Sequence, residues 1–206
     1  MLYLIGGSPR GGKSILSRKL SKKLNVPYIS TDTLRLVVLP YFNDKDKNFP
    51  FIKMYDTITI DKFFQKYSGQ EQLRADLREA KSTWPGIKSL IDYLLICKMD
   101  YIVEGIHLLP SFVKHYKGNK DVKIVFLTKL DEEKIYTGLF KNKHNSDWLM
   151  DNAKRKETIK IAAKAMSEYG KYFLKETKEY GFKCFNTEDE FLKKINAVDK
   201  YLKNKN

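Results

Sequence analysis

A glycine-rich octet at residues 7–14, GSPRGGKS, constrains the fold of this chain more than any other segment. It follows an apolar run at 2–5 and precedes residues 15–24, where apolar side chains recur at helical spacing. The octet fits the pattern GxxxxGK followed by Ser or Thr, which is typical of a phosphate-binding loop. Glycines allow a tight turn in which several amide N–H groups point at one anion, and a helix starting near Gly12 would direct its positive dipole end there. The segment therefore predicts a strand, a phosphate loop and a helix in succession.

The residue types in the loop indicate how it would hold ATP and Mg²⁺. Lys13 can reach the β- and γ-phosphates, and the Ser14 hydroxyl can supply one ligand to the metal. The alternative interpretation is a glycine turn that contains lysine and serine by chance. We expect the nucleotide to be held by Gly7, Ser8, Arg10, Gly11, Gly12, Lys13, Ser14 and Ile15.

Length and composition indicate one cytoplasmic domain. The chain has 206 residues and no apolar stretch of membrane-spanning length, and its first residues read as strand and loop rather than as a signal peptide. Cys97 and Cys184 do not have metal-ligand spacing, and we expect them to be buried, reduced thiols.

The formal net charge of +14 comes almost entirely from lysine. Such an excess could hold nucleic acid, but the lysines are dispersed and no basic motif with interleaved aromatic residues is visible. We favour a lysine-rich, solvated surface, because net charge by itself indicates solubility and association behaviour and does not indicate the fold.

Strand-like and helix-like segments alternate along the chain, which predicts an α/β fold with a parallel sheet and helices on both faces. The strands are expected at 2–5, 27–30, 101–105, 122–128 and 182–185. We expect a helical insertion at about 40–82, a helix at 86–98, a long helix at about 149–180, a closing helix at 188–202 and a mobile lid at about 141–156. Ligands of such sheets gather at the carboxyl ends of the strands.

Asp32 and Arg35 are the candidate acceptor-binding residues. They follow the second strand, three residues apart on the first turn of an expected helix, and so share a face. The carboxylate could take the proton of an acceptor hydroxyl, and the guanidinium could hold an acceptor phosphate or carboxylate bidentately. The alternative is a helix cap with a solvated arginine.

Glu104 and His107 follow the third strand. A carboxylate at the end of an apolar strand is costly to bury without a partner, so Glu104 is expected to contact the metal or the acceptor, or to form a structural ion pair, for example with Lys13. His107 could contact the substrate or serve as a hydrogen-bonding scaffold.

Arg155 lies at the end of the expected lid and is the only arginine in the second half of the chain. Lid closure excludes water from a phosphoryl-transfer site, so Arg155 is the candidate for stabilising the transferring group, although Lys154-Arg155-Lys156 also fits a solvated helix face. Arg74 and Arg78 could clamp an anionic acceptor or pair with Glu71 or Glu79.

The phosphate loop, the segment 29–35 (ISTDTLR) and the segment 102–110 (IVEGIHLLP) together resemble P-loop kinases similar to archaeal 2-phosphoglycerate kinase. Zeta toxins and polynucleotide 5′-kinases share the first two elements. The resemblance covers about 1–36 and 101–150. It implies a P-loop NTPase three-layer α/β/α fold of the adenylate-kinase type, with a five-stranded parallel sheet in the order 2-3-1-4-5, Asp32 as acceptor base and Arg35 as acceptor binder.

These observations predict an ATP- and Mg²⁺-dependent kinase that acts on a small hydroxyl-bearing or phosphorylated acceptor. Lys13, Asp32 and Arg155 are the expected catalytic residues; Ser14 and Glu104 would hold the metal. Asp32, Arg35, Glu104 and His107 would bind the acceptor. Two alternatives stay open: a nucleic-acid 5′-kinase, favoured by the +14 charge, and a nucleotide-binding protein without an acceptor.

Overall fold

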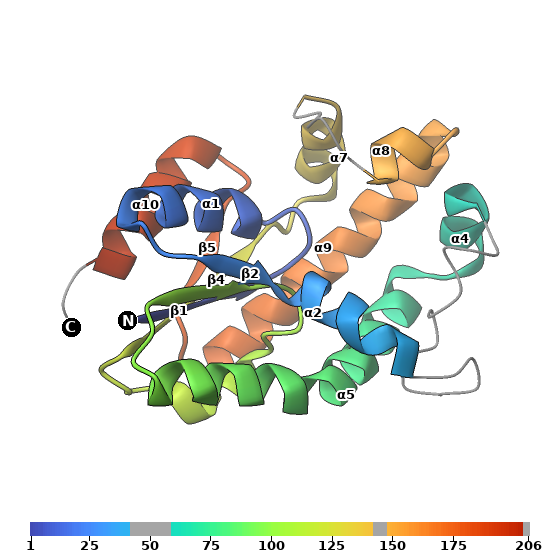
Figure 1. Cartoon of the computed structure of the whole chain (residues 1–206). Helices are drawn as coiled ribbons and strands as arrows, with labels where there is room; N and C mark the ends of the chain where they lie inside the picture. Colours follow the sequence, from blue (N-terminus) through green and yellow to red (C-terminus); the bar gives the residue numbers. More distant parts are fainter. Residues whose placement is uncertain (42–58, 142–147, 204–206) are drawn as a thin grey trace.

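A parallel β-sheet runs through the centre of the protein (Figure 1). The computed structural model describes residues 1–41, 59–141 and 148–203, and within them the sheet has five strands in the order β2-β3-β1-β4-β5. Every neighbouring pair is parallel. The expected fold class and strand order are confirmed. The strands are β1 (Leu2–Gly7), β2 (Tyr28–Ser30), β3 (Tyr101–Glu104), β4 (Val122–Thr128) and β5 (Cys184–Asn186).

Helices connect the strands and cover both faces of the sheet (Figure 1). Short 3₁₀ segments follow α2 at Leu39–Tyr41 and α6 at Lys114–Tyr116. The helices are α1 (Lys13–Leu24), α2 (Thr31–Val38), α4 (Ile60–Lys66), α5 (Gly69–Ile96), α6 (Pro110–Val113), α7 (Glu132–Lys141), α8 (Trp148–Asn152), α9 (Lys156–Glu179) and α10 (Phe191–Lys203).

Alternate residues of the buried strands face opposite layers, as the pleat requires. In β1, Leu2 and Leu4 pack with α5, α6 and α9, whereas Tyr3 and Ile5 pack with α1 and α10. A third apolar cluster lies away from the sheet, where α4, α7 and α8 pack on the first half of α9. The two sheet-facing clusters pack the helices on the sheet, and the third holds α4, α7 and α8 on the first half of α9 (Figure 1).

The helix expected at 86–98 is much longer than predicted. α5 begins at Gly69, inside the expected insertion, and continues through Pro85 to Ile96. Pro85 and Gly86 are helix breakers in sequence terms, but the two halves of α5 bury Ala75, Ala80 and Ile87 against the rest of the protein. Tertiary burial therefore overrides the local signal, and the insertion does not end as a separate unit near residue 82.

The long helix expected at 149–180 is interrupted. α8 ends at Asn152, and α9 starts only at Lys156. The carboxylate of Asp61 on α4 accepts hydrogen bonds from the Lys154 amide, at 3.2 Å, and from the Thr158 hydroxyl. Asp61 thus ties the segment before α9 and the first turn of α9 to α4. The last strand begins at Cys184 instead of Phe182, and the closing helix begins at Phe191 instead of residue 188.

The two cysteines differ in exposure, contrary to the expectation that both are buried. Cys97 follows the end of α5 and is exposed, while Cys184 is half-buried and lies 3.6 Å from the Thr128 hydroxyl. Both are free thiols. Among the helices of the described ranges, none has the length and apolar character needed to cross a bilayer.

Candidate active site

The loop from Gly7 to Gly12 has the backbone of a phosphate cradle. Gly7 has a φ of +130°, and a Cβ there would lie 1.9 Å from the Leu127 carbonyl oxygen. The loop is also tied to the sheet and to itself, because the Ser8 amide donates to Leu127 O at 3.0 Å and the Gly11 amide donates to Ser8 O at 3.2 Å. Gly12, at φ +98°, caps α1, so the first amides of that helix face the loop.

The Lys13 ammonium lies across this loop and is almost fully buried. Its Nζ donates to the Ser8 carbonyl oxygen at 2.8 Å. Burial lowers the pKa of Lys13, while the negative charges of Glu104 and Asp32 oppose that shift. A buried ammonium among backbone carbonyls and carboxylates is suited to neutralising phosphate oxygens, which would bring charge to the same point.

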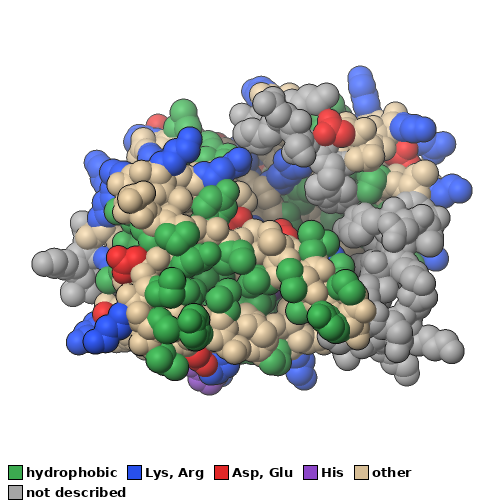
Figure 2. Space-filling model, viewed as in Figure 1, with side chains coloured by type: hydrophobic (Ala, Val, Ile, Leu, Met, Phe, Trp, Pro, Cys, Tyr) green, Lys and Arg blue, Asp and Glu red, His purple; other side chains and the backbone are tan. Residues whose placement is uncertain are grey.

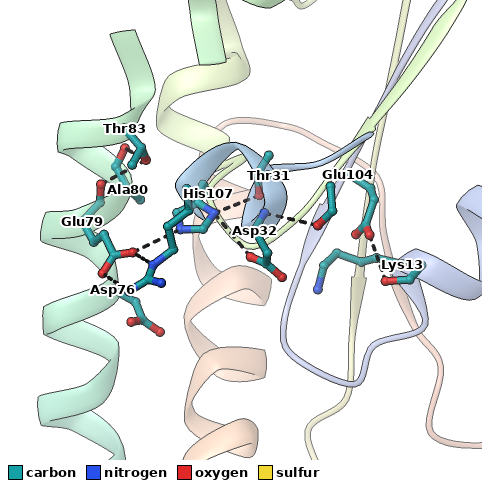
Figure 3. A network of polar contacts seen from close by, with 12 residues as sticks. Lys13, Thr31, Asp32, Asp76, Glu79, Ala80, Thr83, Glu104 and His107 are labelled. Carbon is teal, nitrogen blue, oxygen red and sulfur yellow. Dashed lines mark hydrogen bonds and ion pairs between the residues drawn. The ribbon is translucent and has the colours of Figure 1, made fainter. Parts of the chain in front are cut away.

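Ser14 and Glu104 meet beside Lys13 (Figure 3). Ser14 Oγ donates to Glu104 Oε1 at 2.9 Å, and the Glu104 side chain is only 3% exposed. Burial raises the pKa of Glu104, and the nearby Lys13 charge and the Ser14 hydrogen bond counteract it. The register of the sheet explains the meeting, since Glu104 is aligned with Ile5 of β1 and Ser30 of β2 at the carboxyl ends of the strands.

An open cleft of about 450 Å³ lies next to this pair, between α1 and the edge strand β2. It gives solvent and ligands access to the carboxylate and the hydroxyl. The residues lining it are Ser14, Arg18, Tyr28, Ile29, Ser30, Thr33 and Glu104.

Asp32 lies on the first turn of α2 and is directed toward the same region (Figure 3). Ser30 caps that helix, its hydroxyl accepting from the Asp32 amide at 3.2 Å. The Asp32 side chain is 67% exposed, and its charge acts on the pKa values of Lys13 and Glu104. Asp32 is therefore an accessible carboxylate close to Lys13 and Glu104, and its role as acceptor base stays a prediction.

Arg35 does not present a free guanidinium. Its Nε and Nη2 donate to the two carboxylate oxygens of Glu79 on α5, the second at 3.2 Å. The side chains are 16% and 3% exposed, respectively. The sequence predicted an arginine held ready for an acceptor anion, and the structure instead brings a buried counter-charge to it from 44 positions along the chain.

His107 is buried behind Asp32 and joins the same network (Figure 3). Its Nδ1 shares a hydrogen bond of 2.8 Å with the Thr31 hydroxyl and lies 3.7 Å from Asp32 Oδ1, and its Nε2 lies 3.9 Å from Glu79 Oε1. Burial lowers the pKa of His107, although the charges of Asp32 and Asp76 oppose the shift. A neutral ring that bonds Thr31 fits the scaffold interpretation, because Thr31 carries the start of α2.

Arg155 lies apart from these residues. It is the N-cap of α9, and its backbone amide and its charge both lower the pKa of Asp61 on α4. Figure 1 shows the start of α9 beside α8 and away from α1. A catalytic role for Arg155 therefore stays a prediction that depends on movement of this segment. Residues 142–147 of the expected lid and 42–58 of the expected insertion lie outside the described residues.

Sequence reasoning missed Glu79 and Asp76 as members of the site. Glu79 appeared only as a possible partner of Arg74 or Arg78, yet its partner is Arg35. Asp76 accepts a hydrogen bond from the Tyr169 hydroxyl on α9; burial raises its pKa, while that bond opposes the shift. The two acids are three residues apart and so share one face of α5, which was the available signal. It did not indicate the site, because nothing in the sequence shows that this face of the expected helical insertion meets Arg35 and His107.

The residues present fit a magnesium-bound nucleoside triphosphate. Gly7 and Gly11 let the loop lie directly against the backbone of Leu127 on β4, where a Cβ would not fit, and Lys13 supplies a buried positive charge. Ser14 and Glu104 place a hydroxyl and a carboxylate oxygen together, which is the oxygen chemistry that Mg²⁺ prefers.

Comparison with known proteins agrees with this description. The 2-phosphoglycerate kinase of Methanocaldococcus jannaschii is 27% identical over 136 residues, which are 65% of this chain and 43% of that protein. The 2-phosphoglycerate kinase of Methanothermobacter thermautotrophicus is 22% identical over 156 residues, 75% of this chain and 51% of that protein. The chain thus spans about half the length of the curated relatives it matches. No protein-family profile matches it.

A solved structure with a similar fold is deoxyadenosine kinase from M. mycoides with bound dATP, with a TM-score of 0.51 and 14% identity, covering 99% of this chain and 100% of that one. At this identity the likeness concerns the fold alone. The phosphate loop, the strand order and the sequence matches together show that the chain has a P-loop kinase fold. Its sequence resembles those of the archaeal 2-phosphoglycerate kinases.

Proposed function

We propose that the protein is an Mg²⁺- and ATP-dependent phosphotransferase that moves the γ-phosphoryl group to a small-molecule acceptor with a hydroxyl or phosphate oxygen. One observation carries the proposal: Ser14 and Glu104 are in hydrogen-bond contact beside the buried Lys13, and the exposed carboxylate of Asp32 lies on the adjacent helix (Figure 3). A phosphate cradle, a metal-ligand pair and an acceptor base are the parts that phosphoryl transfer needs.

Each residue has a separate task in this reaction. The loop amides and Lys13 hold the β- and γ-phosphates, and Ser14 and Glu104 hold Mg²⁺, which when bound neutralises charge on the phosphate oxygens. Asp32 accepts the proton of the acceptor hydroxyl. The acceptor oxygen then forms a bond to the γ-phosphorus, the bond from that phosphorus to the bridging oxygen breaks, and ADP leaves.

The test uses Lys13→Ala and Asp32→Asn, with two matched controls. Lys22→Ala removes an exposed lysine of the same helix, and Asp121→Asn changes an exposed acid at the opposite end of the sheet. We expect Lys13→Ala to lose ATP binding in calorimetry, and Asp32→Asn to bind ATP normally but to transfer no phosphoryl group when a metabolite pool is screened. Full transfer by Asp32→Asn would remove Asp32 from the mechanism.

The net charge of +14 favours one further candidate, a nucleic-acid 5′-kinase. Lysine and arginine side chains gather over α1 and α10 and again near α8 in the view of Figure 2. Such a protein should bind short oligonucleotides with an affinity that falls steeply with salt. Absent or salt-independent binding would count against this candidate, and tight nucleotide binding without any phosphorylated product would favour a binding protein.

A further inference from the structure

The acceptor side of the site is dominated by acids. We use "acceptor side" for the set Asp32, Arg35, Asp76, Glu79 and His107, which come from α2, α5 and the segment after β3. Figure 3 shows Asp32, Asp76, Glu79 and His107 to one side of Lys13, and Arg35 is bound to Glu79. Three of the five are carboxylic acids, and the histidine is kept neutral by burial. In the space-filling view, acidic side chains show in the hollow between the two halves of the molecule (Figure 2).

The one arginine of this set is already neutralised. Arg35 and Glu79 form a two-point contact, the geometry in which a guanidinium binds a carboxylate most strongly. Glu79 is the more deeply buried partner, at 3% exposure, and its oxygen also lies 3.9 Å from His107 Nε2. An anion that bound Arg35 in place of Glu79 would leave the buried Glu79 carboxylate without its counter-charge, which is strongly unfavourable.

The second acid on the same face of α5 adds to the effect. Asp76 accepts a hydrogen bond from the Tyr169 hydroxyl; burial raises its pKa, and the charges of His107, Arg35 and Asp32 also act on that pKa, so each of these three groups lies within electrostatic range of Asp76. A phosphate or carboxylate next to the reacting hydroxyl would therefore face repulsion from the exposed Asp32, and Arg35, the one arginine of the five residues, is already bound to Glu79. Hydroxyl groups, in contrast, can donate to these carboxylates.

We propose that Glu79 is a specificity-determining residue that makes the acceptor side select an uncharged polyhydroxy compound and reject phosphorylated or carboxylated ones. The proposal rests on the proposed kinase function. It separates this chain from its curated relatives, which are named for an acceptor that carries both a phosphate and a carboxylate. The contact between Arg35 and Glu79 is then a means of excluding anions, whereas the sequence alone suggested an anion-binding arginine.

The test titrates 2-phosphoglycerate and, as its uncharged counterpart, glycerol into protein saturated with Mg²⁺ and a non-hydrolysable ATP analogue, followed by calorimetry. The proteins are the parent chain, Glu79→Gln, Arg35→Met and the double variant Arg35→Met/Glu79→Gln. Glu79→Gln keeps the shape and removes the charge. We expect it to bind 2-phosphoglycerate roughly 10- to 100-fold more tightly than the parent, the range that a charge-assisted hydrogen bond supplies. The gain should vanish in the double variant, and glycerol binding should not respond to Glu79→Gln.

Two results would overturn the inference: tight binding of 2-phosphoglycerate by the parent that Arg35→Met abolishes, or no gain in Glu79→Gln despite a normal circular dichroism spectrum. If Glu79→Gln fails to fold, the parent and Arg35→Met still decide the question by the first result. Binding of the nucleotide analogue is measured first in every protein. If the parent does not bind the nucleotide analogue, the proposed function is refuted. The inference about Glu79 is judged separately, by whether anion binding depends on Arg35.

Discussion

Replacing Gly7 by alanine tests the phosphate-loop geometry most directly. The added Cβ would lie 1.9 Å from Leu127 O, while a carbon and a carbonyl oxygen in contact stand roughly 3.3 Å apart. The loop must therefore move away from β4 by about 1.4 Å. The residue must also keep a φ of +130°, which costs a residue with a side chain about 1–3 kcal/mol.

The expected loss of stability follows from these two effects. Movement of the loop breaks the 3.0 Å hydrogen bond from the Ser8 amide to Leu127 O, a loss of about 1 kcal/mol. With the backbone strain, the free energy of unfolding should fall by about 3 kcal/mol, or roughly 6–12 °C in Tm for a chain of this size. A phosphate cradle displaced by an ångström should bind nucleotide about 100-fold more weakly.

The control is Gly86→Ala. Gly86 is an exposed glycine inside α5, and a Cβ added there meets no atom within 4 Å. This change should raise the unfolding free energy by about 0.5–1 kcal/mol and leave nucleotide binding unchanged. Thermal unfolding followed by circular dichroism and calorimetric titration of ATP measure both quantities. If Gly7→Ala melts within about 2 °C of the parent and binds ATP equally well, the described loop geometry is wrong.

Two further predictions concern pH. Burial lowers the pKa of Lys13 from its ordinary 10.5, so ATP affinity should fall as pH rises from about 7 to 10 and the ammonium loses its proton. Glu104→Gln removes a charge that raises this pKa and should move the fall to lower pH. An ATP affinity that does not change over this pH range would contradict the assignment. Asp199 on α10 is 7% exposed and contacts Lys23 and Lys203. Burial raises its pKa, but these lysine contacts outweigh burial and hold the pKa below its ordinary value of 3.8. The stabilisation is therefore present above that pH and is lost as pH falls through the lowered pKa. Asp199→Asn should reduce the unfolding free energy by about 1–3 kcal/mol at pH 7 and by progressively less below pH 4 in urea denaturation; a difference that does not change with pH would refute this.

Features that depend on neighbours in the chain were predictable. The glycine pattern requires a turn that only a few residue types can adopt, so the loop and the start of α1 follow from eight adjacent residues. The alternation of apolar runs with helical segments predicted the parallel sheet, and the resemblance to known kinases implied its strand order, which the structure has. Asp32 and Glu104 could be placed at one edge of the sheet because parallel strands end together.

Features that depend on contacts between distant residues were not predictable. α5 crosses Pro85 because both of its halves are buried, and Asp61 on α4 binds the residues around the start of α9. Local propensities amount to about 1 kcal/mol per residue for glycine and about 3 kcal/mol for proline, and burial of several apolar side chains exceeds these values.

The sequence by itself therefore determined that this chain has a phosphate loop, a parallel sheet and an acid after the second strand. Only the tertiary structure decided what Arg35 does. Its position on the first turn of α2 is the same whether it binds an acceptor anion or an acid of the protein, and the sequence contains many candidate acids. Packing of α5 against α2 brings Glu79 to it, because the charge that a side chain meets in a folded protein depends on position in space and not on separation along the chain.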